Sequence, residues 1–132
     1  MTNTCTTETE QKKKGQYFTP DDIVNRMIEF TDLNWFGNIY EPTAGDGNIV
    51  MKIIDKKVSL GITPQEAIDT TYANEFDTQV YDALTARLKT YCDEHNIIYR
   101  EENITNQDAC VFKPGCDKYE IITNLPFGSW TN

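Results

Sequence analysis

The sequence predicts an α/β fold in which a parallel sheet carries helices on its faces. Short apolar strands alternate with amphipathic helices along the chain, in the order strand, helix, strand, helix, strand. This alternation is typical of parallel sheets, because each connection between parallel strands must cross the sheet with a right hand. The length of 132 residues suits one domain, and no internal repeat interrupts the pattern.

Composition narrows the classes of protein before any motif is considered. The 12 basic and 21 acidic residues give a net charge of −9, which argues against binding to nucleic acid through bulk positive charge. No apolar run is long enough for a membrane span, and the start lacks the apolar segment of a secretory signal. The four cysteines have no CxxC spacing and no companion cluster around the single His95. We therefore expect no zinc site, reduced thiols and a cytoplasmic location.

The first half of the chain contains a tail, two helices and one strand. Residues 1–14 are polar and lack apolar periodicity, so we expect a flexible tail followed by a domain over residues 15–132. Thr19 is a typical helix N-cap with Pro20 at the first helical position, and the helix is expected to end at about Thr31. Residues 37–42 predict a brief strand, and residues 43–47 a turn of small residues. The second helix follows, with an apolar face formed by Ile49, Val50, Ile53 and Ile54.

The second half continues the alternation. Residues 63–66 match a capping pattern that opens a single helical turn, and residues 69–76 read as a strand. The longest helix is predicted from Asp77 to about Asp93. A third strand is predicted over residues 96–100 and a fourth over residues 119–123, where the chain runs into Asn124.

Four polar residues follow the predicted strands: Glu41, Glu75, Asp108 and Asn124. Ligands of open parallel sheets bind beyond the carboxyl ends of the strands, so we expect these residues to lie close together. Glu75 in this place can accept both hydroxyls of a ribose, and Asp108 can accept from an exocyclic amine. The simpler interpretations are a solvated glutamate and an aspartate that caps a turn.

Two local patterns add to this predicted site. Gly45 and Gly47 lie where a strand enters a helix, a position at which backbone can approach a ligand closely and offer N–H groups to an anion. Taken alone, this pair also fits a simple tight turn. Around Pro126, the Asn124 side-chain oxygen and the preceding backbone carbonyl can both accept from one amino group, while Phe127 stacks on the base that carries it.

Three segments together resemble a known family. Residues 41–47, EPTAGDG, resemble motif I, the cofactor loop of S-adenosylmethionine-dependent methyltransferases. Residues 124–127, NLPF, resemble motif IV of the members that methylate amino groups, and residues 14–20, KGQYFTP, are similar to motif X of the adenine-N6 DNA methyltransferases of restriction–modification systems. The motifs occur in the family's order, and the resemblance covers roughly residues 12–128. It implies a Rossmann-like methyltransferase fold with strand order 3-2-1-4, truncated after strand 4.

The resemblance also implies a role for each matching residue. Asn124, Leu125, Pro126 and Phe127 are expected to hold a target adenine that is turned out of its stack. The expected cofactor residues fall in four groups. They are Tyr17, Phe18, Thr19 and Pro20 at the methionine end; Glu41, Pro42, Ala44, Gly45 and Gly47 in the loop; Glu75 at the ribose and Phe76 at the adenine ring; and Asp108 and Ala109 at its amine.

Departures from the family pattern leave alternatives open. Leu125 replaces the first proline of the DNA-enzyme motif, which leaves an rRNA adenine or a protein glutamine as other possible targets. The sequence stops eight residues after Asn124, so strands five to seven of the family are not in it. We therefore expect DNA to be bound only with the missing strands or a partner chain, and a second polypeptide or a homo-oligomer to meet the open edge of strand four. The acidic charge also fits a non-catalytic cofactor-binding or decoy module, and residues 12–14, three lysines, fit either phosphate contacts or a solvated tail.

Overall fold

The computed structural model describes residues 20–110 and 114–123. It contains a four-stranded parallel sheet of order β3-β2-β1-β4, as predicted. The elements in chain order are α2 (Asp21–Phe30), β1 (Ile39–Glu41), α3 (Asn48–Ser59), α4 (Pro64–Asp69), β2 (Thr71–Asn74), α5 (Thr78–Glu94), the 3-10 helix η1 (Glu101–Asn103), β3 (Ile104–Thr105) and β4 (Glu120–Ile121). The register pairs Tyr40 with Tyr72 and with Ile121, and Ala73 with Ile104.

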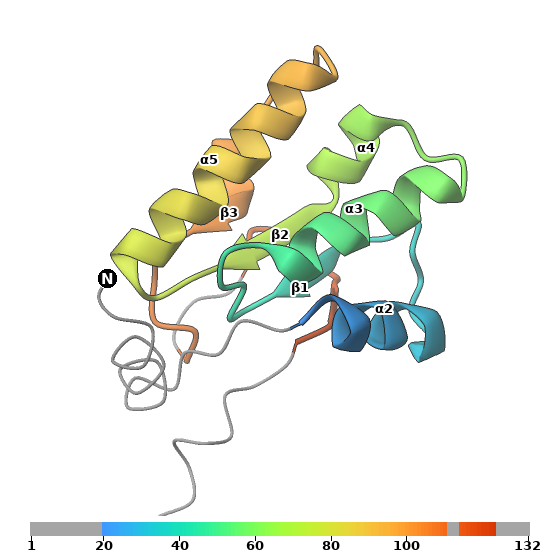
Figure 1. Cartoon of the computed structure of the whole chain (residues 1–132), viewed down its shortest axis with the longest axis horizontal. Coiled ribbons are helices and arrows are strands. Elements are labelled where there is room, and N and C mark those ends of the chain that lie inside the picture. The colour runs from blue at the N-terminus through green and yellow to red at the C-terminus, as the bar shows by residue number, and fades with distance from the viewer. Residues whose placement is uncertain (1–19, 111–113, 124–132) are drawn as a thin grey trace, which may run out of the picture.

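Helix α3 lies between α2 and α5 along the sheet (Figure 1). The crossovers from β1 to β2 and from β2 to β3 run in the same direction, so the right-handed rule places α3 and α5 on the same face. The two sides of α3 enter separate apolar clusters. Val50 and Ile54 pack with residues of α4, α5, β2 and β3, whereas Ile49 and Ile53 pack with Val24 of α2, Trp35, Ile39 and Ile122. These clusters fix the strand ends on which the candidate site depends.

The predicted third strand is wrong in position. Residues 96–100 form no strand, and β3 is instead the two-residue segment Ile104–Thr105. The backbone of the predicted segment is satisfied elsewhere: the Ile97 N–H donates to the carbonyl of Cys92 at the end of α5 (3.0 Å). The Gln65 side chain accepts from the Ile98 N–H (2.8 Å) and donates to the Ile98 carbonyl (3.0 Å), which replaces a strand ladder.

The other predicted elements need smaller corrections. Pro20 is the N-cap of α2 rather than its first helical residue, with extended backbone at φ −62° and ψ 152°. The second strand is limited to residues 71–74 because Asp69 still belongs to α4 and the chain turns at Glu75 towards α5. The predicted cap at Thr63 is confirmed, since its hydroxyl accepts from the Glu66 N–H at 3.2 Å.

A buried lysine stabilises the amino ends of β1 and β2, at the edge of the sheet opposite the carboxyl ends of the strands. Lys57 of α3 is fully buried, and its Nζ donates to the carbonyls of Trp35 (2.8 Å) and Gly37 (2.6 Å) and to Thr70 Oγ1 (3.0 Å). Burial lowers its pKa to about 8, against a smaller opposing effect of the Glu66 carboxylate. These three bonds connect the helix to the segment before β1 and to the residue that precedes β2.

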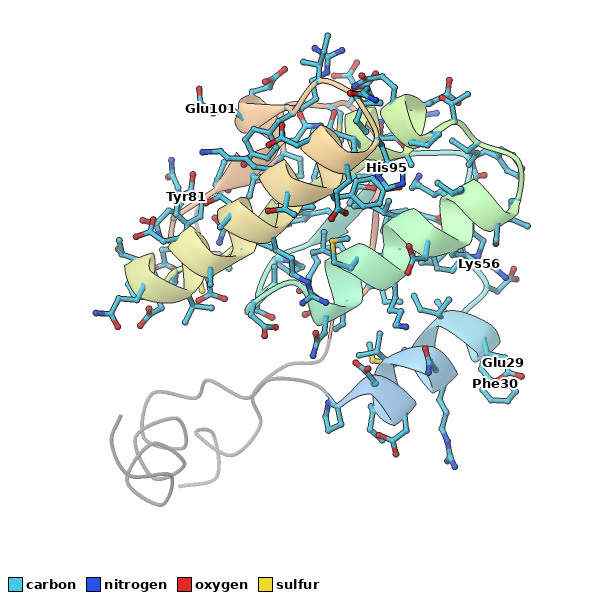
Figure 2. All side chains as sticks on the ribbon, turned by 45° about the horizontal axis from the view of Figure 1, so that its top comes forward. Glu29, Phe30, Lys56, Tyr81, His95 and Glu101 are labelled. Atoms are coloured by element: carbon cyan, nitrogen blue, oxygen red, sulfur yellow. The ribbon has the colours of Figure 1, made fainter. Side chains whose placement is uncertain are left out.

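Among the described residues, no helix is long and apolar enough to cross a membrane. The same residues contain no group of three or more metal-ligating side chains placed to hold an ion. Phe30 is exposed at the end of α2 and points away from the sheet (Figure 2).

Candidate functional site

The glycine loop of residues 42–47 lies against the carboxyl end of β2. Its Ala44 N–H donates to the carbonyl of Asn74 at 2.9 Å. The Glu75 carboxylate links the glycine loop to the start of α5. Its Oε1 accepts from the Gly45 N–H (2.8 Å), and its Oε2 accepts from the Asp77 N–H (2.9 Å). The structure therefore brings the loop and Glu75 together, as the strand-end argument predicts.

The loop requires glycine at two positions. Gly45 and Gly47 have φ of 60° and 103°, in the left-handed region that other residues rarely adopt. A Cβ on Gly47 would also lie 3.0 Å from the Leu84 Cδ1 of α5. Arg87 of α5 holds the same turn from outside, because its Nη1 donates to Asn48 Oδ1 (2.9 Å) and to the Asp46 carbonyl (3.3 Å). The loop conformation is thus set by close packing as well as by backbone geometry.

Glu41 is a fully buried carboxyl group at the end of β1. Its Oε1 accepts from the Thr43 N–H (2.7 Å) and the Thr43 hydroxyl (3.3 Å), whereas Oε2 is buried without a hydrogen-bond partner among the described residues. Burial raises the Glu41 pKa to about 7, the Glu75 charge adds to the rise, and the Thr123 and Thr43 groups limit it. A buried carboxyl oxygen without a partner is suited to a cationic donor.

Glu75 and Phe76 differ in exposure in a way that suits a nucleoside. The Glu75 side chain is only 8% exposed, so it is not the solvated glutamate of the simpler interpretation, whereas Phe76 is 70% exposed. The backbone of both residues is held by Asn106, whose Nδ2 donates to the carbonyls of Glu75 (2.7 Å) and Phe76 (3.0 Å). The segment thus presents an aromatic ring to solvent beside a fixed carboxylate.

Asp108 follows β3 at the same edge of the sheet and has a local structural partner. It is exposed, and its Oδ1 accepts from the Cys110 N–H at 2.9 Å, which is the turn-capping role of the simpler interpretation. Ala109 lies in the same turn, and Pro42 is half-buried at the start of the glycine loop. Pro20 is exposed at the start of α2. The predicted ligand roles of these four residues stay predictions.

Several predicted site residues lie outside the described part of the chain. These are Tyr17, Phe18 and Thr19 before α2, and Asn124, Leu125, Pro126 and Phe127 after β4. The last described residue, Thr123, nevertheless reaches the glycine loop, because its hydroxyl lies 2.9 Å from the hydroxyl of Thr43. The chain therefore arrives beside the loop one residue before Asn124.

Four residues that organise this edge were not predicted from the sequence: Thr43, Asn74, Asn106 and Thr123. Asn74 carried the clearest signal, since it is a polar residue in a strand of a parallel sheet, where residues are ordinarily buried and apolar. Asn106 could have been noticed as an amide directly after a strand, although its partners are backbone carbonyls 30 and 31 residues away.

Comparison with known proteins identifies the family. The family model described as N-6 DNA Methylase matches residues 4–132, and the chain belongs to this family. No curated protein matches the sequence. Among solved structures, the chain is similar to one described as the cryoEM structure of a DrdV–DNA complex, with a TM-score of 0.58 and 20% sequence identity. The match covers 76% of this chain but 11% of that chain, and it supports the Rossmann-like methyltransferase fold.

Proposed function

We propose that this chain provides the cofactor-binding part of a DNA methyltransferase that transfers a methyl group from S-adenosylmethionine to the N6 amino group of adenine. Membership of the N-6 DNA methylase family supports the class of enzyme. The observation that carries the proposal is the convergence on one glycine loop. Glu75 bonds Gly45 of this loop, and Thr123 contacts the loop just before motif IV. Beside the loop, Glu41 has a buried oxygen that no other described residue bonds.

The described residues fit the parts of this cofactor. Glu41 Oε2 offers a buried acceptor for the α-ammonium group, which would favour the ionised carboxylate. The Glu75 carboxylate keeps lone pairs for ribose hydroxyls, and the exposed Phe76 ring offers a face to the adenine. When bound, the cofactor supplies an activated methyl group on its sulfonium.

The chemistry at the target amine is assigned to residues beyond the described part of the chain. Asn124 and the Leu125 carbonyl accept hydrogen bonds from the N6 amino group, and Phe127 stacks on the base. These bonds draw the nitrogen lone pair out of conjugation with the ring. Holding the amine in position for transfer would supply most of the rate, and no covalent enzyme intermediate would be needed.

DNA recognition is assigned to other parts of a longer protein or to a partner chain. The chain spans 11% of the length of the DrdV chain, whose structure is described as a complex with DNA. Its net charge of −9 is poorly suited to neutralise phosphates by itself. The family favours DNA over the rRNA and glutamine targets that motif IV leaves open.

Calorimetric titration with S-adenosylmethionine tests the cofactor assignment. The wild-type chain is expected to bind, and Glu75→Ala to weaken binding at least tenfold. The matched control is Glu101→Ala, an exposed glutamate on η1, away from the glycine loop (Figure 2), which should leave the affinity unchanged. Absence of binding to the wild-type chain, or equal loss in both variants, would overturn the proposal. Transfer of labelled methyl groups to DNA, compared with rRNA and glutamine peptides, tests the substrate.

A further inference from the structure

Asn74, the last residue of β2, is a fully buried amide with complete hydrogen bonding. Its Oδ1 accepts from the Thr105 hydroxyl (2.7 Å) and the Gln107 N–H (2.9 Å). Its Nδ2 donates to the carbonyls of Gln107 (2.7 Å) and Pro42 (3.2 Å). An asparagine side chain has two donor hydrogens and one oxygen with two lone pairs, so these four bonds use its full capacity.

The partners of Asn74 lie in or directly after the two strands that flank its own, β1 and β3. Pro42 opens the glycine loop after β1 and follows Glu41 directly. Gln107 follows Asn106, the residue whose side chain holds the backbone of Glu75 and Phe76. The main chain of Asn74 adds a further link to the loop, because its carbonyl accepts from the Ala44 N–H. One side chain therefore joins the glycine loop to the segment after β3.

The bonding pattern allows only one orientation of the amide. Two donors of the protein face Oδ1 and two carbonyls face Nδ2. A rotation by 180° would set like groups against each other at three of these contacts, all except the Thr105 hydroxyl, which can also accept. A buried strand position is ordinarily filled by an apolar residue, and a buried polar group lowers stability unless it is fully paired. The complete pairing of Asn74 thus specifies the relative position of its neighbours as well as filling space.

We propose that Asn74 is a positioning residue for the cofactor site, which fixes the glycine loop relative to the carboxyl ends of β2 and β3. The identity of the ligand in this inference rests on the proposed function, whereas the hydrogen bonds of Asn74 do not depend on it. It acts through the backbone, since the carbonyls of Pro42 and Gln107 accept its two Nδ2 hydrogens. Without the Asn74 side chain, the glycine loop is no longer fixed relative to β2, and the hydrogen bond of 2.8 Å between the Gly45 N–H and Glu75 Oε1 loses its support.

The test compares two asparagine-to-aspartate substitutions. Asn74→Asp keeps the volume and the Oδ1 acceptor but removes both donor hydrogens, leaving a carboxylate oxygen against two carbonyls. The matched control is Asn103→Asp, because Asn103 is also buried and its Nδ2 donates to the carbonyls of Asp69 (3.1 Å) and Ile68 (3.4 Å) before β2. Both changes should destabilise the chain, but only the first alters the site.

Two readouts separate positioning from stability. Amide hydrogen exchange in the ligand-free chain should accelerate at least tenfold at Gly45 and Asp77 in Asn74→Asp, and stay within twofold in Asn103→Asp. The dissociation constant for S-adenosylmethionine, measured well below both melting temperatures, should rise at least tenfold only in Asn74→Asp. Equal effects of the two substitutions on both readouts would overturn the inference.

A milder variant keeps the test decisive if Asn74→Asp does not fold. Thr105→Val removes one of the four bonds with little change in volume, and exchange at Gly45 should then accelerate about threefold. No acceleration would overturn the inference. If the wild-type chain fails to bind S-adenosylmethionine, the proposed function falls, and the exchange measurement alone decides the role of Asn74.

Discussion

Glu41→Gln is expected to stabilise the chain at neutral and alkaline pH. Burial holds the Glu41 pKa at about 7 in the folded state, against an ordinary value of 4.5. Between these two values the folded state keeps a proton that the unfolded state has lost, so the free energy of unfolding falls as pH rises through this range. Above about pH 7 the loss is complete and amounts to about 3 kcal/mol. Glutamine carries no charge and keeps an oxygen for the Thr43 N–H, so it should avoid this loss.

Urea unfolding of both proteins at pH 4.5 and pH 8 measures the effect. The two should have similar free energies of unfolding at pH 4.5, and the variant should be more stable by about 3 kcal/mol at pH 8. Other titrating groups cancel in the difference between the proteins. The same substitution should weaken S-adenosylmethionine binding at least tenfold, because the carboxylate is the proposed partner of its ammonium group. A variant no more stable than wild type at pH 8 would refute the reasoning about burial.

Three further predictions follow from the same geometry. Gly47→Ala should lower the free energy of unfolding by about 2 kcal/mol and weaken cofactor binding, because φ is 103° and the new Cβ would lie 3.0 Å from a Leu84 methyl group. Gly115→Ala should do neither, because a Cβ added there would meet no neighbouring group within 4 Å. Lys57→Met should lower the free energy of unfolding by about 3 kcal/mol in urea titrations, because it removes the donor of one buried and two partly buried oxygens, whereas Lys56→Met on the same helix should change it little. Asn124→Ala should abolish methyl transfer while cofactor affinity by calorimetry stays within a fewfold of wild type, and retained transfer would contradict the motif IV assignment.

Local sequence patterns were sufficient to predict most of the helices and the strands that consist of buried, mainly apolar residues. The cap at Thr63 and the long helix after Asp77 follow from side chains next to the backbone groups that they satisfy. The third strand was misplaced because β3 has two residues, and its identity depends on pairing with Ala73 and Asn74 rather than on its own composition. The apolar residues of segment 96–100, Ile97 and Tyr99, pack against the core without joining the sheet.

The residues of the candidate site could be predicted in outline, but the side chains that hold them in place could not. The rule that ligand residues follow parallel strands placed Glu41 and Glu75 beside the loop, and the structure confirms that neighbourhood; their binding roles stay predictions. The structural roles of Asn74 and Lys57 were not predicted, because most of their partners are backbone groups distant in sequence. Such partners leave no mark in the local residue pattern.

The enclosed ε-amine of Lys57 makes it a natural reporter of local opening. Amine-directed acylating reagents need a solvent-accessible, unprotonated nitrogen, and this one is fully covered and shared among three oxygens. Its rate of labelling, read by mass spectrometry, should therefore follow how often the segment before β1 detaches from α3. The labelling rate therefore measures how often the sheet opens at the end remote from the glycine loop.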